Sequence, residues 1–306
     1  MRPLVALIAL AVLAAAGSNA HASRAAFTAK GRNPANTFTT AADFPPAVTL
    51  TAPAAGSYTN DTTPTFSGAA GTAIGDSATI TLRVYSGTTA TGTAVQTRTA
   101  TRIGGTWTTT LTAALAAGTY TVRAAQADSA GNTGSATVTF TIDTTPPQPA
   151  TISTANAANG ANGRLDAGDS ITYGFSEAIA PASVLSTFGG GSTTADVQVF
   201  FSNAGTTDYF ALRDSGGQQN VRLDSYVASN AELVTANVTW PATLTQSSDG
   251  RSFTVTLGTA PASGVGATAN TARNMAWSPK AGPTDRAGNA LSFSGTTAEI
   301  DGDVDF

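Results

Sequence analysis

The stretch DSAGNTGSATVTFTIDTTPP, residues 128–147, carries the signals of a turn, then of a strand, and then of the end of that strand. Gly131 and Asn132 tolerate positive φ, and the Asp128 carboxylate can accept backbone N–H bonds, so a tight turn is predicted here. The segment from Ala136 onward alternates Thr with larger apolar residues, which is the period of a strand. Pro146 and Pro147 then impose an extended connection.

The same alternation extends outward from this stretch in both directions along residues 47–143. Short segments rich in β-branched and aromatic residues are separated mostly by Gly, Asn, Asp or Pro, a pattern that predicts strands joined by turns. Seven strands in about one hundred residues is the count of an immunoglobulin-like sandwich. The seven segments are residues 47–53, 63–70, 78–87, 94–102, 105–111, 118–127 and 136–143.

The second half of the chain shows the same kind of pattern over a longer span. Residues 180–188 predict one or two helical turns with Pro181 near the start. The second half has 159 residues, more than a minimal sandwich needs, so a larger sandwich is expected. The sequence predicts an all-β chain with two tandem immunoglobulin-like β-sandwich domains, at 47–147 and 148–306. The strand-like segments of the second are 149–154, 169–177, 196–201, 208–214, 220–227, 236–244, 251–258, 272–279 and 290–296.

The N-terminus predicts export. Arg2 precedes an apolar run, and Ala20-His21-Ala22 supplies a small-x-small end, so residues 1–22 are expected to be a signal peptide cleaved after Ala22. The run is shorter than the roughly 20 residues of a spanning helix, so no membrane span is expected in the mature chain. Residues 23–46 are poor in apolar residues and end in Pro-Pro, which predicts an extended leader. We therefore expect a secreted, extracellular protein associated with the cell surface.

The composition excludes most catalytic chemistry. The chain has no cysteine, and its single histidine, His21, lies in the predicted signal peptide. A thiol nucleophile, a Ser-His-Asp relay and a zinc ion held by His or Cys are therefore excluded in the mature chain. The net charge is −4 and no basic patch is evident, so no nucleic-acid partner is expected. These features favour a protein that is not an enzyme.

Carboxylates are the main remaining chemistry, and Ca²⁺ is the ion they would bind. The plainer interpretations are tight turns, in which Asp bonds its own backbone, and a solvated acidic tail. The candidate calcium ligands fall into three groups: Asp128 and Asn132 with Asp143; Asp166 and Asp169 with Asp285; and the alternating run Asp301, Asp303 and Asp305 with Glu299.

Two further kinds of residue are candidates for a binding or catalytic role. Glu177 ends a strand-like segment and could act as the general acid of a glycosidase, although nothing in the spacing selects its partner carboxylate. Trp107, Trp240 and Trp277 lie in alternating segments and are expected in the core. Because Pro241 favours an edge strand, the Trp240 ring is expected to be partly exposed.

Both halves resemble bacterial Ig-like modules. APAAGSYTNDTTPTFSGAAG at 52–71, together with the stretch at 128–147, resembles the bacterial Ig-like domains repeated in large surface adhesins. LDAGDSITYGFSEAI at 165–179 and MAWSPKAGPTDRAGNALS at 275–292 resemble another Ig-like type of surface and S-layer-associated proteins. In both, the Asp-x-Ala-Gly-Asn motif is expected to lead into the last strand. The resemblance implies adhesion or a structural spacer, with a cell-surface glycan, the cell wall or a protein as partner.

The leader carries a second resemblance. AAFTAKGRNPANTFTTAADF, residues 25–44, is similar to the beginning of camelysin-like biofilm fibre proteins. The resemblance implies that the leader could add as a strand to the sheet edge of the next copy, so that copies of the chain are the partner. A disordered tether and an accessory part of a carbohydrate-active enzyme remain the alternatives. The matching positions are Ala26, Phe27 and Thr28, then Asn36, Thr37, Phe38 and Ala41.

Overall fold

The computed structural model describes residues 44–188, 192–205, 207–229, 232–266 and 274–300. By its internal contacts the chain divides after Ala42, and all the described residues belong to the second of the two units. The described part is nearly all β, which confirms the predicted class. Its helix, α1 (Pro181–Val184), is a single turn with proline in its first turn. Within the described ranges, no helix has the length and apolar character needed to cross a bilayer.

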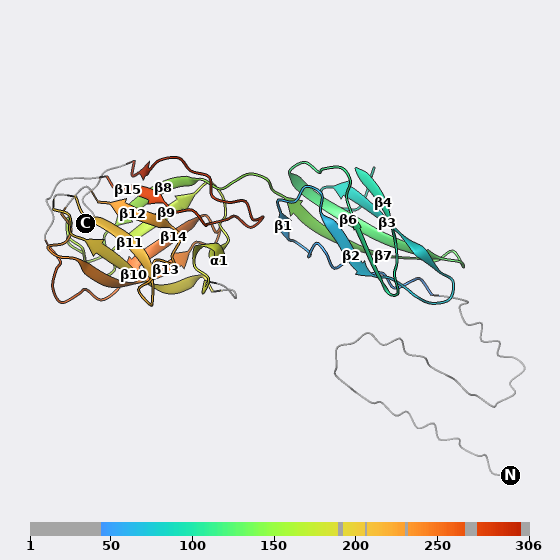
Figure 1. Cartoon of the computed structure of the whole chain (residues 1–306), viewed down its shortest axis with the longest axis horizontal. Coiled ribbons are helices and arrows are strands. Elements are labelled where there is room, and N and C mark those ends of the chain that lie inside the picture. The colour runs from blue at the N-terminus through green and yellow to red at the C-terminus, as the bar shows by residue number, and fades with distance from the viewer. Residues whose placement is uncertain (1–43, 189–191, 206, 230–231, 267–273, 301–306) are drawn as a thin grey trace, which may run out of the picture. The chain divides into compact units, whose positions relative to one another are not determined.

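The first sandwich packs a five-stranded sheet against a two-stranded one (Figure 1). Its strands are β1 (Tyr58–Thr59), β2 (Thr65–Ala69), β3 (Asp76–Ser86), β4 (Gln96–Thr101), β5 (Thr106–Thr110), β6 (Gly118–Asp128) and β7 (Thr133–Ile142). The larger sheet has the order β1-β7-β6-β3-β4, and β2 pairs with β5. Phe66, Trp107 and Phe140 lie buried between the two layers. The Trp107 indole Nε1 donates to the Ala69 carbonyl at 3.1 Å, so its one polar atom is satisfied in the core.

Six of the seven predicted strands are present in this sandwich, as β2 to β7. The segment 47–53 is not a regular strand, although the Thr51 N–H bonds the Ser67 carbonyl of β2 at 2.8 Å. The extra strand β1 has only two residues and pairs in parallel with β7. An alternating pattern needs at least four residues to be recognised, so β1 could not be predicted.

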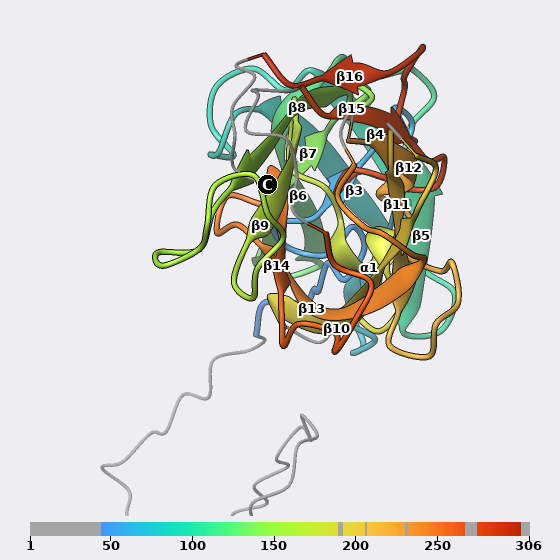
Figure 2. The ribbon, with the colours of Figure 1, turned by 90° about the vertical axis from the view of Figure 1, so that its left-hand side faces the viewer.

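The second half contains one nine-stranded sheet (Figure 2). Its strands are β8 (Pro149–Ala155), β9 (Ser170–Phe175), β10 (Thr194–Ser202), β11 (Tyr209–Asp214), β12 (Asp224–Ala228), β13 (Val238–Gln246), β14 (Ser252–Leu257), β15 (Ala276–Pro279) and β16 (Thr297–Ala298). The order is β16-β15-β12-β11-β10-β13-β14-β9-β8, and the sheet curls over so that its two edge strands, β16 and β8, lie in contact. A large core that includes Tyr173, Trp240 and Trp277 fills the interior.

A buried carboxylate joins the two edges of the curled sheet. Glu299 is only 5% exposed and follows β16 directly. One of its oxygens, Oε1, accepts from the Thr154 N–H of β8 at 3.0 Å, and Oε2 accepts from the Met275 N–H at 3.1 Å. These charge-assisted bonds connect β8 to the chain that enters β15. The Glu299 side chain thus takes the place of strand pairing along this seam.

Two predictions for the second half are wrong. Trp240 is fully buried because β13 lies between β10 and β14, away from either edge. The last pair between β13 and β14 is Ala242 with Leu257, because β14 ends at Leu257. Pro241 lies one residue beyond this pair, so the N–H that proline lacks is not needed for pairing with β14. The predicted last strand, 290–296, is also absent: the Ser292 N–H bonds the Pro147 carbonyl at 2.9 Å instead of joining the sheet.

The core of the second half also encloses an ionisable pair. The Tyr173 hydroxyl donates to Asp224 Oδ2 at 3.1 Å, and the Leu212 N–H donates to Asp224 Oδ1 at 3.2 Å. Burial raises the pKa of Asp224 from its ordinary 3.8 to about 6, and the two hydrogen bonds and the charge of Lys280 oppose that rise only in part. The folded chain therefore holds this proton at pH values where the unfolded chain has released it.

This difference predicts that the free energy of unfolding falls as the pH rises from about 4 to about 6. The shift from 3.8 to about 6 corresponds to a loss of about 3 kcal/mol, which persists above that range. Urea denaturation at steps of pH measures it. Asp224→Asn should remove this fall in the free energy of unfolding between about pH 4 and 6. Asp196→Asn, a change at an exposed position of β10, should keep it. Parallel slopes in all three proteins would contradict the assignment.

Candidate functional site

The two Asp-x-Ala-Gly-Asn motifs form the same turn. The Asp128 carboxylate accepts from the Asn132 N–H and from the Asn132 side chain, both at 2.8 Å. Asp285 accepts from the corresponding groups of Asn289 at 2.8 and 2.7 Å. The glycine of each motif has a φ close to +90°, which favours glycine at that position. Burial raises the pKa of Asp128, but the hydrogen bonds from Asn132 together with those from the Ala130 and Gly131 backbone outweigh it and leave that pKa lowered.

The second turn differs from the first in bringing three acidic side chains together. Asp143 follows β7, Glu177 lies just beyond β9, and Asp285 opens the turn. One carboxylate oxygen from each lies within 4.8 Å of the other two. Asn289 also donates to the Asp143 carbonyl at 2.8 Å, so the turn is tied to the residue that ends the first sandwich. We call Asp143, Glu177 and Asp285 the carboxylate cluster.

The cluster lines a hollow of about 280 Å³ that also contains Arg251 and Asp249. Burial raises the pKa of Glu177, and the charges of Asp143 and Asp285 raise it further, against the lowering effect of Arg251. Glu177 Oε1 is inaccessible to solvent and has no hydrogen-bond partner among the described residues. A carboxylate with a buried, unpartnered oxygen, close to two further carboxylates, is an arrangement that a cation would stabilise.

From the sequence, the three residues of the carboxylate cluster are assigned to three separate candidate sites. Asp143 and Asp285 were expected in separate calcium groups, and Glu177 was considered as a general acid. The three residues are 142 positions apart at most, so no local spacing could connect them. Arg251 was missed altogether, because a single arginine beside a turn carries no signal in the sequence.

The structure does not bring Asp128 and Asn132 to Asp143. Asn132 precedes β7 and Asp143 follows it, and this strand has ten residues. At a rise of about 3.3 Å per residue the two ends lie about 33 Å apart. Asp128 and Asn132 therefore sit in a turn at one end of the sandwich, while Asp143 lies at the other end.

Asp166 and Asp169 also lie away from Asp285. They precede β9, whereas Glu177 follows its other end, about 20 Å further along a six-residue strand. Asp169 is fully buried and accepts from the Ala157 N–H at 2.9 Å and the Asp166 N–H. Burial raises its pKa, although these backbone bonds oppose the rise. The pair organises the loop that enters β9.

The C-terminal group divides into two parts. Glu299 is occupied by its bonds to Thr154 and Met275 in the seam of the sheet, so it does not project with the tail. Asp301, Asp303 and Asp305 lie outside the described residues. Calcium binding by these three remains a prediction from their alternate positions.

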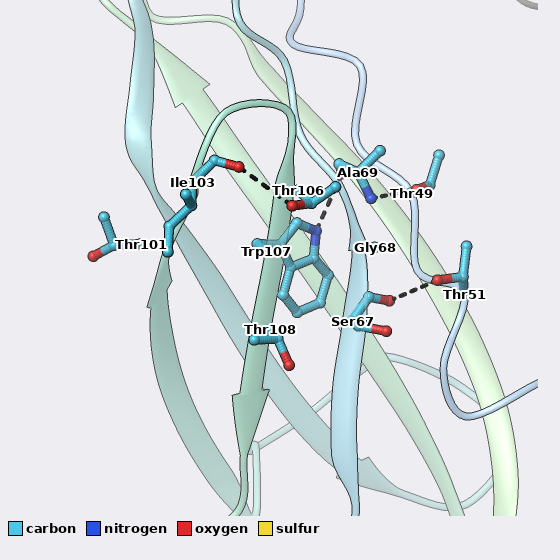
Figure 3. A pocket seen from close by; sticks show the side chains of 10 residues that line it. All are labelled: Thr49, Thr51, Ser67, Gly68, Ala69, Thr101, Ile103, Thr106, Trp107 and Thr108. Carbon is cyan, nitrogen blue, oxygen red and sulfur yellow. Dashed lines mark hydrogen bonds between the residues drawn. The ribbon is translucent and has the colours of Figure 1, made fainter.

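A second hollow, of about 500 Å³, lies over Trp107 and is lined by residues of the paired strands β2 and β5 (Figure 3). Its hydroxyls serve the fold: Thr51 Oγ1 donates to the Ser67 carbonyl at 3.1 Å, and Thr49 Oγ1 accepts from the Ala69 N–H at 2.7 Å. Thr106 Oγ1 donates in the same way to the Ile103 carbonyl. No charged residue lines this hollow. Three of the hydroxyls that line this hollow are therefore engaged by the fold.

Comparisons with known proteins bear mainly on the first sandwich. No curated protein matches the chain. Among solved structures, the chain is similar to a tetra-tandem repeat in the extending region of a large adhesion protein. The identity is 15% and the TM-score 0.23, over 78% of this chain and 71% of that chain. Residues 51–144 match the family model of the bacterial Ig-like domain, which confirms the predicted resemblance of the first sandwich to that family.

Proposed function

We propose that this protein is a secreted, non-enzymatic cell-surface or matrix protein whose first sandwich serves as an adhesion or spacer module. The match of residues 51–144 to the bacterial Ig-like domain carries the proposal. The composition supports it, because the predicted mature chain has neither Cys nor His. In the carboxylate cluster, both oxygens of Asp285 already accept N–H bonds, so this side chain serves the turn.

Export can be tested directly. When the whole chain is produced in a bacterial host with a Sec pathway, we expect a mature protein that begins at Ser23, because the small residues Ala20 and Ala22 fit signal peptidase. N-terminal sequencing and protease treatment of intact cells measure the cleavage and the location. A substitution of Ala22→Glu should leave the precursor uncleaved. An unprocessed wild-type chain protected inside the cell would overturn the proposed location.

We further propose that the carboxylate cluster binds Ca²⁺ and so stiffens the joint beside Asn289. Ca²⁺ accepts six to eight oxygen ligands, several of which can be water. The cluster supplies three carboxylates. Oε1 of Glu177 is buried without a hydrogen-bond partner, and a bound ion would offset the cost of its desolvation. Because Glu177 must lose its proton to bind, affinity should fall as the pH is lowered.

Calcium binding predicts a rise in melting temperature on going from EGTA to about 5 mM Ca²⁺. A dissociation constant near those of extracellular calcium modules would stabilise the chain by about 1 kcal/mol or more. Differential scanning calorimetry of the mature protein measures the shift. Glu177→Gln should abolish most of it, and Asp196→Asn, at an exposed site on β10, should leave it intact. Equal melting temperatures in EGTA and Ca²⁺ would exclude this role.

A fibre subunit is the second candidate, and one observation favours it. β4 is the last strand of the first sandwich's larger sheet, and its outer edge pairs with no strand among the described residues. Such an edge can accept an added strand from another chain. Residues 23–43, whose sequence resembles the camelysin-like leader, would supply that strand.

Light scattering separates the two candidates. If the leader links copies, the chain 23–306 should form multimers whose mass grows with concentration, and the chain 47–306 should stay monomeric. A substitution in the acceptor, Thr99→Pro in β4, should block growth because proline removes a ladder N–H. If both chains stay monomeric at all concentrations, the fibre proposal is rejected and the spacer role is retained.

A further inference from the structure

A separate hollow of about 460 Å³ lies beside α1 in the second half. Residues of the helix and the turn after it form one wall, the segment between β11 and β12 forms another, and the residue after β15 completes it. Its polar lining consists of Ser183, Ser186, Gln219, Asn220, Arg222 and Lys280. The lining contains no aromatic side chain and no carboxylate. Its volume is in the range of small-molecule sites, well above that of a single inorganic ion.

The charge of this hollow is opposite to that of the chain. Acidic residues outnumber basic ones by 19 to 15, yet two basic side chains meet here. Neither forms an ion pair with a described residue. The Lys280 ammonium donates to the Gln219 carbonyl at 2.8 Å and acts on buried Asp224, so part of its charge serves the fold. The Arg222 guanidinium has no such partner and supplies the uncompensated positive charge.

The backbone beside Arg222 is shaped to hold its side chain. The Arg222 N–H donates to the Val184 carbonyl at 2.9 Å, which fixes the residue against α1. A Cβ added at Gly282 would come within 2.5 Å of Arg222 Cδ, so glycine leaves the space in which the arginine stem lies. Gly282 has a φ of +132°, which also disfavours any other residue there. The backbone of Arg222 is therefore fixed against α1 and its stem passes Gly282, while the side chain as a whole is exposed to solvent.

The neighbouring polar groups differ in how far the fold already uses them. Ser183 Oγ donates to the Ala180 carbonyl and accepts from the Thr284 N–H, so it is committed. Asn220 donates its amide to Asp214, which does not line the hollow, and this leaves the Asn220 side-chain oxygen as an acceptor. Ser186 and the Gln219 amide have no hydrogen-bond partner among the described residues. Hydroxyl and amide groups of this kind recognise the hydroxyls of a sugar ring.

We propose that this hollow binds a uronic acid residue of an acidic polysaccharide, with Arg222 holding the carboxylate and Ser186, Gln219 and Asn220 contacting the ring hydroxyls. The planar guanidinium fork matches a carboxylate in two parallel hydrogen bonds. The absence of aromatic lining argues against nucleobases, which need a stacking surface. The inference rests on the proposed surface role, for which it names the class of partner.

Calorimetric titration of the mature chain with trigalacturonate tests the inference, with maltotriose as the neutral sugar and a sulfated disaccharide as the other anion. We expect trigalacturonate to bind and maltotriose to bind at least tenfold more weakly. Arg222→Gln should weaken trigalacturonate binding at least tenfold, and the matched change Arg83→Gln, at an exposed site on β3, should have no effect. The affinity should also fall with added salt, since an exposed charge contributes to it.

Four results would overturn the inference: no heat with trigalacturonate, equal binding of maltotriose, tighter binding of the sulfated sugar, or an unchanged affinity in Arg222→Gln. Melting curves of the variants show whether each one is folded, and Ser186→Ala provides a second variant in which a severalfold loss is expected without loss of charge. A wild-type chain that reaches the cell surface but ignores trigalacturonate rejects this inference alone. A chain that binds trigalacturonate but stays in the cytoplasm rejects the surface role instead.

Discussion

Buried carboxylates that accept backbone N–H bonds hold this chain together in the absence of disulfides. Asp208 is the plainest case: it is fully buried, and its two oxygens accept from Ala204, Leu233 and Val234, which come from two different loops. A buried carboxylate is costly unless such charge-assisted bonds satisfy it, and once satisfied it fixes every segment that donates to it. Asp128, Asp169, Asp285 and Glu299 do the same in other loops. Loop anchoring, which small secreted domains often achieve with cystine, is here achieved with aspartate and glutamate.

This use of acidic residues explains why the fold was easier to predict than the site. Strands follow from local alternation, so β2 to β15 were all anticipated near their observed positions. The helical turn at Pro181 was anticipated in the same way. Predictions failed where tertiary context outweighs the local signal. Pro241 lies in a central strand because its neighbour β14 ends opposite Ala242. In the segment 290–296, Ser292 bonds Pro147 and Leu291 bonds Pro283, and the segment joins no sheet. The curled single sheet of the second half has no signature in the sequence.

The site shows the limit of motif reasoning more sharply. Each aspartate in an Asp-x-Ala-Gly-Asn motif makes the same turn, yet of the two only Asp285 belongs to a cluster of three carboxylates among the described residues. What distinguishes it is the position of its turn next to Asp143 and Glu177, a property of the fold and not of the motif. The basic hollow around Arg222 escaped notice for the same reason, since its residues come from three separate segments. Residue types can be read from a sequence, but convergence of distant segments can be seen only in the folded chain.

The seam at Glu299 has a consequence for the order in which the second half can fold. Thr154 and Glu299 are 145 residues apart, so the sheet cannot close until residue 299 has emerged from the ribosome. Contacts of such long range form slowly, because the loop between them must be ordered first. Until then β8 presents an open edge that another chain could pair with. Because the seam closes late, the chain is most prone to aggregate in the interval before it closes.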